Sequence, residues 1–88
     1  MHVIVNTISG VVFDSTNVKS LSVPGERGEI GFLKNHSPII SYLKKGTISI
    51  TDSDDVKHLI DISVGYSHVN DNTFTITTSF AKKWVNAS

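Results

Sequence analysis

A two-residue alternation of apolar and polar side chains recurs along this chain and limits the folds that it can form. The alternation occurs at Val3 and Val5, Leu21 and Val23, Ile48 and Ile50, Ile60 and Ile62, and Phe74 and Ile76. Successive side chains of a β-strand point to opposite faces, so a period of two places these apolar residues on one face of each segment. Together with the Val, Ile and Thr content, the pattern indicates a series of half-buried strands.

Clusters of turn-forming residues separate the alternating segments, at Ser9-Gly10, Pro24-Gly25, Asp52–Asp55 and Asn70–Asn72. A lone sheet would leave one apolar face in water, so strands at this spacing either pack face to face or close into a barrel. We therefore predict an all-β fold over residues 1–78, a two-sheet antiparallel sandwich. The predicted core contains Val5, Phe13, Val23, Ile48, Ile50, Ile60, Ile62 and Phe74.

The alternation changes in the short C-terminal segment, residues 79–88. Apolar residues there fall at i, i+1, i+4 and i+5, namely Phe80, Ala81, Trp84 and Val85. This spacing predicts at most one short helix, with Ser79 as its N-cap. A frayed tail is the alternative, because so short a helix is marginal without packing.

Composition narrows the possible functions of a chain of 88 residues, a length that fits one domain. Eight basic and eight acidic residues cancel, whereas nucleic-acid binders carry a basic excess, so we expect no nucleic-acid partner. The chain has no cysteine, which excludes disulfides and thiolate metal sites. It shows neither signal-peptide features nor an apolar run of about 20 residues, so we expect any membrane association to go through a partner.

The residue types that carry chemistry show no catalytic or metal-binding arrangement. The four histidines, His2, His36, His58 and His68, form no i, i+4 pair. No Ser-His-Asp set or carboxylate pair has a recognisable catalytic frame. We therefore expect a protein that is not an enzyme, with no cofactor, no metal and no small-molecule ligand.

A glycine-rich segment, residues 23–33, contains glycine at every third position. A phosphate-binding loop is excluded on chemical grounds, because Glu26 and Glu29 stand where phosphate would lie and no Lys-Ser/Thr pair follows. A tight turn between two strands explains the glycines better, since glycine permits a positive φ and a close approach of the backbone.

This segment begins the run VPGERGEIGFLKNHSPIISYLKKGTISI, from Val23 to Ile50. Its ordered motifs are Pro24-Gly25, Gly28-Glu29-Ile30-Gly31, His36-Ser37-Pro38 and Leu43-Lys44-Lys45-Gly46. In their order and spacing they resemble the N-terminal domain of the epsilon-subunit family of rotary ATP synthases. The resemblance extends over about Val3 to Thr78. It departs at Val64-Gly65, where the family has two glycines and where we expect a less bent backbone, and at Asn35, where the family has glycine.

The resemblance implies a β-sandwich that acts as a rotor, or central-stalk, component of an F-type ATP synthase. Such a domain links the gamma subunit to the membrane c-ring and couples proton transport to ATP synthesis. It would lie peripherally at the cytoplasmic face of the bacterial inner membrane, or at the equivalent organelle membrane. In the family the domain continues into a helical hairpin that can inhibit hydrolysis and, in some members, bind ATP. Residues 79–88 are too few for two such helices, so we expect this chain to do neither.

The resemblance also implies two contact surfaces. The c-ring-facing residues would be Glu26, Gly28, Glu29 and Ile30, and the gamma-facing residues would be Thr7, Ser37, Ile40, Thr47 and Ile76. The alternatives are purely structural: Glu29 is an ordinary solvated carboxylate, and Ile40 and Ile76 belong to the core. Independently of any family, Ile39 and Ile40 are adjacent, so only one of them can point inward from a strand.

A free-standing β-sandwich that binds a peptide or a carbohydrate is the alternative function. Such a module would need an aromatic platform, and the chain's candidates, Tyr42, Tyr66 and Trp84, lie in unrelated segments of the sequence. A small enzyme would instead need a cleft with titratable groups of perturbed pKa.

Overall fold

A computed structural model describes residues 1–26, 28–33 and 39–84, without the side chains of residues 29–33 and 39. The described part consists of ten strands and contains no helix. The strands are β1 (His2–Thr7), β2 (Gly10–Ser15), β3 (Val18–Gly25), β4 (Gly28–Leu33), β5 (Ile39–Leu43), β6 (Gly46–Asp52), β7 (Lys57–Ile62), β8 (Gly65–Asn70), β9 (Thr73–Thr78) and β10 (Ala81–Lys83).

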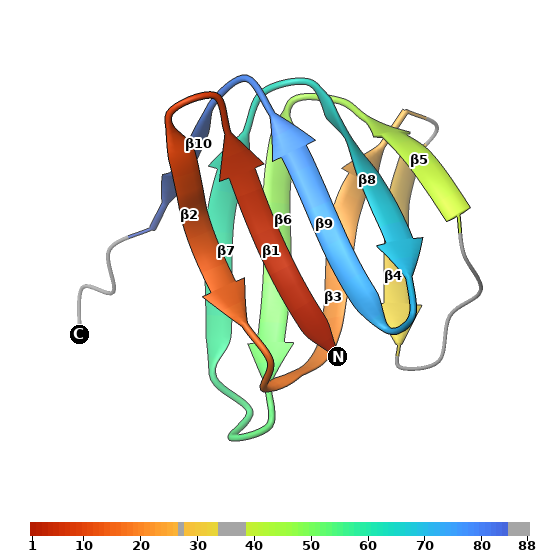
Figure 1. Cartoon of the computed structure of the whole chain (residues 1–88), viewed down its shortest axis with the longest axis vertical. Helices are drawn as coiled ribbons and strands as arrows, with labels where there is room; N and C mark the ends of the chain where they lie inside the picture. Colours follow the sequence, from red (N-terminus) through yellow and green to blue (C-terminus); the bar gives the residue numbers. More distant parts are fainter. Residues whose placement is uncertain (27, 34–38, 85–88) are drawn as a thin grey trace.

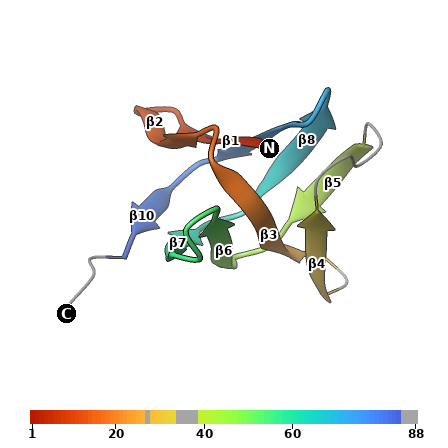
Figure 2. The same ribbon diagram turned by 90° about the horizontal axis from the view of Figure 1, so that it is seen from below.

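The strands form two layers. Along the hydrogen-bonded path the order is β10-β7-β6-β3-β5-β8-β9-β1-β2, and β4 pairs with β3. β3 and β5 share a single residue pair, Gly25 with Leu43, so the path divides there into the layers β10-β7-β6-β3-β4 and β5-β8-β9-β1-β2 (Figure 1, Figure 2). β1 and β9 are parallel, and the other pairs of described strands are antiparallel. The predicted two-sheet sandwich is confirmed.

The core lies between the two layers, and every residue predicted to be in it is buried. Ile48, Ile50 and Ile60 are fully buried because β6 and β7 turn the same alternate positions inward. Val3 and Val5 of β1 and Phe74 and Ile76 of β9 meet them from the other layer. Val56 precedes β7 and is exposed, so the inward face of this segment does not extend back to it.

The possible C-terminal helix is wrong for residues 79–84. Ala81 and Lys83 pair with Ile62 and Ile60, so this stretch extends the sheet as β10. The Trp84 amide donates to the Leu59 carbonyl at 2.8 Å and continues the pairing. A helix of two or three turns leaves most of its terminal backbone groups unpaired, whereas an added strand also satisfies those of β7.

The turns gather at the two ends of the sandwich. One end, here called the upper end, carries the β1–β2, β3–β4, β5–β6, β7–β8 and β9–β10 connections (Figure 1). The lower end carries the β2–β3, β6–β7 and β8–β9 connections and Met1. In the part of the chain that the structure describes, no helix has the length and apolar character needed to cross a membrane.

Candidate interaction surfaces

The glycine-rich segment forms the β3–β4 hairpin at the upper end, as predicted. Gly25 pairs with Gly28, so the chain reverses direction between these two glycines. Gly28 has a φ of +131°, which only glycine adopts readily. The Glu26 side chain is exposed.

The four residues predicted to face the ring therefore share one hairpin. The backbones of Glu29 and Ile30 pair with Pro24 and Val23 inside β4, one and two residues beyond the loop. Their side chains lie outside the described part, so the expected exposure of Glu29 stays a prediction.

Two further glycines of the motif are required by close packing at the upper end. A Cβ on Gly65 would lie 2.2 Å from the Thr77 carbonyl oxygen, a contact that backbone cannot relieve locally. A Cβ on Gly46 would lie 2.7 Å from the Pro24 side chain. At Val64-Gly65, where the family has two glycines, Gly65 is the position that the backbone of β9 approaches closely. Val64 is exposed and points outward.

Thr78 holds two upper-end turns together. Its buried hydroxyl lies 3.2 Å from the Ser63 carbonyl, 3.0 Å from the Val64 carbonyl and 3.1 Å from the Phe80 carbonyl. The Ser63 amide also donates to the Phe80 carbonyl at 3.1 Å. The β7–β8 and β9–β10 turns are thus a single hydrogen-bonded unit.

The residues predicted to face gamma do not form one surface. Ile76 is fully buried, so its assignment to a contact surface is wrong: β9 turns it inward with Phe74, as the core alternative required. Thr47 lies on the outer face of the β10-β7-β6-β3-β4 layer, and Ile40 on that of the other layer. Thr7 is half-buried at the upper end, and Ser37 lies outside the described residues.

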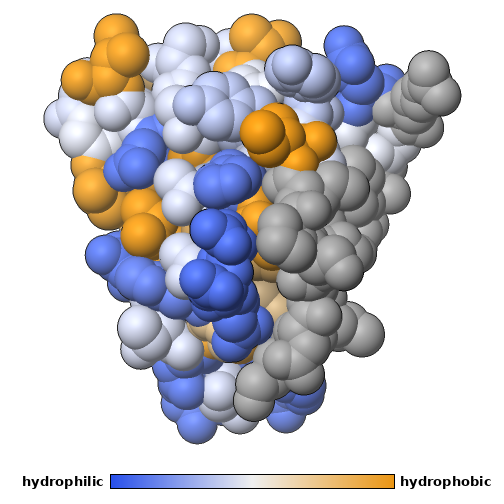
Figure 3. Space-filling view, turned by 45° about the vertical axis from the view of Figure 1, so that its right-hand side comes forward, coloured by the Kyte–Doolittle hydropathy of each residue, from blue (hydrophilic) through white to orange (hydrophobic). Residues whose placement is uncertain are grey.

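Ile40 belongs instead to an exposed face that the sequence did not reveal. It is 61% exposed and pairs with His68 across β5 and β8. Two residues further along the same two strands, Tyr42 pairs with Tyr66, and these residues are 67% and 44% exposed. We call Ile40, Tyr42, Tyr66 and His68 the tyrosine face; Figure 3 views this side of the molecule.

The pairing of Tyr42 with Tyr66 brings together two of the three aromatic residues considered for a platform. They belong to unrelated segments of the sequence, yet they lie directly opposite each other on neighbouring strands. The missing signal was the β5–β8 register, which joins residues 24 positions apart in the sequence. With Ile40, two exposed aromatic residues on a small domain make a candidate partner surface.

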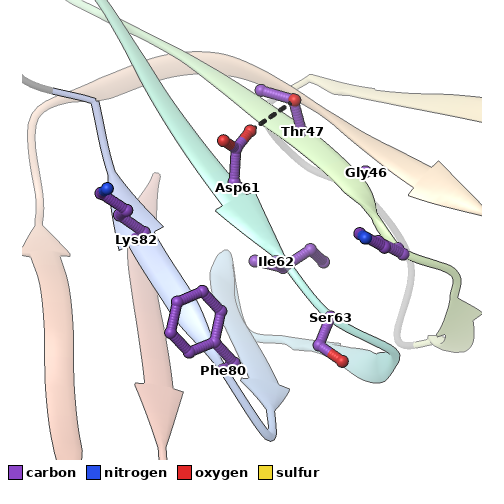
Figure 4. A pocket seen from close by; sticks show the side chains of 8 residues that line it. Gly46, Thr47, Asp61, Ile62, Ser63, Phe80 and Lys82 are labelled. Atoms are coloured by element: carbon purple, nitrogen blue, oxygen red, sulfur yellow. Dashed lines mark hydrogen bonds between the residues drawn. The ribbon is translucent and has the colours of Figure 1, made fainter.

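An open hollow of about 760 Å³ lies on the opposite layer near the upper end. Its lining includes Lys45, Phe80 and Lys82, with Asp61 between β6 and β10 (Figure 4). Hydrogen bonds from Trp84 and then from Thr47, at 2.7 Å, hold the pKa of Asp61 below its ordinary value. The positive charge of Lys82 acts in the same direction.

The lower end is organised by a carboxylate. Asp52 Oδ1 accepts hydrogen bonds from the Asp54 and Val56 amides at 2.9 and 3.0 Å, and Asp52 Oδ2 lies 3.0 Å from His58 Nε2. The His58 contact, followed by the Val56 bond, lowers the pKa of Asp52. His58 is half-buried against the Phe13 ring. Among the described residues, no three His, Cys, Asp or Glu side chains come together as a metal site.

Comparison with known protein families agrees with this architecture. The family described as "ATP synthase, Delta/Epsilon chain, beta-sandwich domain" matches residues 1–83. The chain belongs to this family. The match includes β10, so the family's domain also extends past Thr78.

The similar curated proteins are bacterial ATP synthase epsilon chains. The protein from Campylobacter curvus is 37% identical over 76 residues, which is 86% of this chain and 58% of the relative. The protein from Nitratiruptor sp. is 41% identical over 69 residues, which is 78% of this chain and 53% of the relative. The domain thus spans somewhat more than half the length of these relatives.

Solved structures share the fold. A chain in the Euglena gracilis mitochondrial ATP synthase, in a structure of OSCP, F1 and the c-ring, aligns with 92% of this chain at a TM-score of 0.85 and 23% identity, over 51% of its own length. A chain in the Tetrahymena thermophila mitochondrial ATP synthase central stalk and c-ring aligns with 93% at a TM-score of 0.78 and 16% identity, over 65% of its own length. At these identities the likeness supports the sandwich fold alone.

Proposed function

We propose that this domain is a non-catalytic rotor component of an F-type ATP synthase, which joins the gamma subunit to the membrane c-ring. Gamma binds the tyrosine face, and the c-ring meets the β3–β4 hairpin at the upper end. Torque transmission needs a rigid body with two separate contact surfaces. The observation that carries the proposal is that a closely packed sandwich presents an exposed aromatic face and a glycine-built end at different places.

In this arrangement the domain would lie peripherally at the cytoplasmic face of a bacterial inner membrane, or at the equivalent organelle membrane. Family membership and the bacterial relatives support this location. Ring rotation driven by proton transport would turn the domain and gamma together, and so couple transport to ATP synthesis.

The tyrosine face has the composition of a protein contact. Tyrosine is enriched among the residues that contribute most to binding, because it buries a large area and loses little conformational entropy. Ile40 adds apolar area beside the two rings, and His68 adds a polar edge. This face replaces the gamma-facing set predicted from the sequence, of which it retains Ile40.

Binding of purified gamma subunit to the 88-residue chain tests the gamma contact. Removing both rings with Tyr42→Ala and Tyr66→Ala should weaken binding about tenfold or more, because each truncation at an interface centre costs over about 1 kcal/mol. Val56→Ala at the lower end is the matched control, since Val56 is 45% exposed and far from this face. Unchanged affinity in the double variant would remove the tyrosine face from the proposal.

The ring contact is tested separately in a reconstituted synthase. Glu29→Lys should leave the domain folded, because an exposed ion pair is worth only about 0–1 kcal/mol. It should nevertheless weaken the docking of the domain on the ring and the coupling of proton transport to ATP synthesis. Coupling that survives the charge reversal would count against the assigned role of Glu29.

The tyrosine pair also favours a second candidate, a module that binds a peptide in extended form. On β5 and β8 the exposed pairs Tyr42–Tyr66 and Ile40–His68 follow each other at a two-residue spacing, which suits alternate side chains of a bound strand. Gamma binding by the unmodified chain distinguishes the two functions. If the chain does not bind the gamma subunit but binds peptides from a random library through Tyr42 and Tyr66, the peptide-binding module is favoured.

A further inference from the structure

The outer faces of the two layers differ in charge. In one layer, β7 and β10 turn Lys57, Asp61 and Lys82 outward. In the other layer, which Figure 1 views from its outer side, the described outward-facing residues of β5, β8, β9 and β1 include no Lys, Arg, Asp or Glu. These residues are Ile40, Tyr42, Tyr66, His68, Asn70, Thr73, Thr75, Thr77, His2, Ile4 and Asn6.

This uncharged face is wider than the tyrosine face and contains it. Depletion of charged residues is the compositional signal of the buried centre of a protein interface. A stable interface takes about 20–30 residues from each partner, so the four residues of the tyrosine face can form only its centre. The contact therefore has room to continue over the threonines of β9 towards β1.

His68 lies inside the uncharged face. Its side chain is exposed, and its neighbours across the strands are Ile40 on β5 and Thr75 on β9. Along β8 the residues on the same side are Tyr66 and Asn70. The elements packed against β8 thus place apolar, hydroxyl and amide groups around the imidazole ring.

The charged side chains of this layer stand at the borders of the face. Glu26 and Lys44 belong to turns at the upper end, beyond the two tyrosines. Asp71 lies in the β8–β9 turn at the lower end, and Asp14 on β2 pairs with His2. Because tyrosine ionises near pH 10, histidine is the residue type of this face that changes its charge between about pH 5 and 8.

We propose that gamma covers this face with an uncharged surface opposite His68, and that protonation of His68 releases gamma. The inference rests on the proposed function and adds regulation to its gamma contact. Burial disfavours a charged imidazolium that has no counter-charge. The complex therefore binds fewer protons than the separate proteins, so the affinity is complete above the ordinary pKa of histidine and falls as the pH decreases below it.

An uncharged partner surface follows from the surroundings of His68. A carboxylate of gamma placed there would lose its water against Ile40, Thr75 and Tyr66, and at neutral pH it would have no positive charge beside it. Apolar and hydroxyl groups of gamma match these three residues without that cost. A domain that leaves gamma in acid would disconnect gamma from the ring under that condition.

The affinity of the 88-residue chain for purified gamma subunit, measured as a function of pH, tests the proposal. Between about pH 7.5 and pH 5.5 the affinity should fall about tenfold, as expected for one histidine that must be neutral in the complex. His68→Gln should bind like the unmodified chain at the higher pH and should keep that affinity at the lower pH. His68→Lys should bind at least about tenfold more weakly at both, because it stays charged.

His2→Gln and His58→Gln are the matched controls. His2 lies at the border of the face in contact with Asp14, and His58 belongs to the other layer, where it contacts Asp52. Both variants should keep the loss of affinity in acid. Circular dichroism at both pH values should show that each chain remains folded.

The outcomes separate this inference from the proposed function. If gamma binds equally at both pH values, or if His68→Gln keeps the acid dependence, the role of His68 is wrong while the gamma contact stands. The same holds if His68→Lys binds as tightly as the unmodified chain. Affinity that rises in acid through His68 would place a carboxylate of gamma opposite it and overturn the uncharged surface. Absence of gamma binding at every pH would overturn the gamma contact itself, and this inference with it.

Discussion

The two ends of the sandwich are built in different ways. At the upper end the turns are held by uncharged contacts: Gly65 packs on the Thr77 carbonyl, Gly46 packs on the Pro24 ring, and the Thr78 hydroxyl lies within hydrogen-bond distance of three carbonyls. At the lower end the β6–β7 turn is held by side chains, through the carboxylate of Asp52. The upper-end contacts involve none of the side chains at the turn tips, which are therefore free to project, whereas the lower-end turn is held by a charged side chain of its own.

This difference explains where partner surfaces are available. The upper-end tips carry Ile8, Val64 and Phe80 outward because their turns need none of these side chains for support. At the lower end, Lys19 pairs with Asp55 and His58 with Asp52, so several charges are already engaged within the domain. We therefore expect mutations to affect the two ends through different physical terms.

The largest effect should come from the core that joins the two ends. Phe74→Ala removes a fully buried ring and should lower the free energy of unfolding by about 3–5 kcal/mol. Both ends should lose protection together in hydrogen exchange, because they share this core. Independent unfolding of one end would show that they are separate cooperative units.

Gly65→Ala should be the most damaging change at the upper end. The added Cβ would meet backbone at 2.2 Å, so strands β8 and β9 must separate, at a cost of about 3 kcal/mol or more. Gly46→Ala is the matched control, since its Cβ meets a side chain rather than backbone. Urea unfolding should rank Gly65→Ala well below Gly46→Ala in stability, and equal midpoints would contradict the contact.

Thr78→Val tests the hydroxyl that links two upper-end turns. Valine keeps the shape but leaves the Ser63, Val64 and Phe80 carbonyls without this donor, which should cost about 1–3 kcal/mol. Thr78→Ser should restore most of the loss because it keeps the hydroxyl group. If serine is no better than valine, packing rather than hydrogen bonding holds the turns.

Asp52→Asn should have a smaller effect that depends on pH. The folded pKa of Asp52 is lowered by His58 and by the Val56 amide, so its stabilising contribution is complete above the unfolded pKa of about 3.9 and is lost as the pH falls through the folded value. In urea unfolding the variant should be less stable than the unmodified chain near neutral pH, and the difference should shrink in acid. A difference that is independent of pH would exclude the carboxylate as its cause. Thr78→Val should leave the acid dependence unchanged.

Ser67→Ala should change stability least. The Ser67 hydroxyl is fully buried without a hydrogen-bond partner among the described residues, so its removal relieves a desolvation cost. We expect an unchanged or slightly raised unfolding midpoint. A loss above about 1 kcal/mol would mean that the hydroxyl has a partner, such as a buried water.

Most of the fold was predictable from the sequence because strand alternation is a local property. The period of two identified the buried residues of β6 and β7 and Phe74 of β9, and the turn residues located the hairpins. The glycine-rich segment could be identified as a turn, because the reversal between Gly25 and Gly28 requires a positive φ at Gly28 that glycine adopts readily. β10 was missed because its pairing with β7 depends on an unpaired strand edge that only the folded sheet creates.

The sequence alone determined the all-β class, the core and the family resemblance, since each follows from residue types at short spacing. Only the tertiary structure decided that Ile76 is buried, that Tyr42 faces Tyr66, and that the apolar tips gather at one end. These features depend on register and on the order of strands in the sheets. Register is set by contacts between residues distant in sequence, and no local pattern encodes it directly.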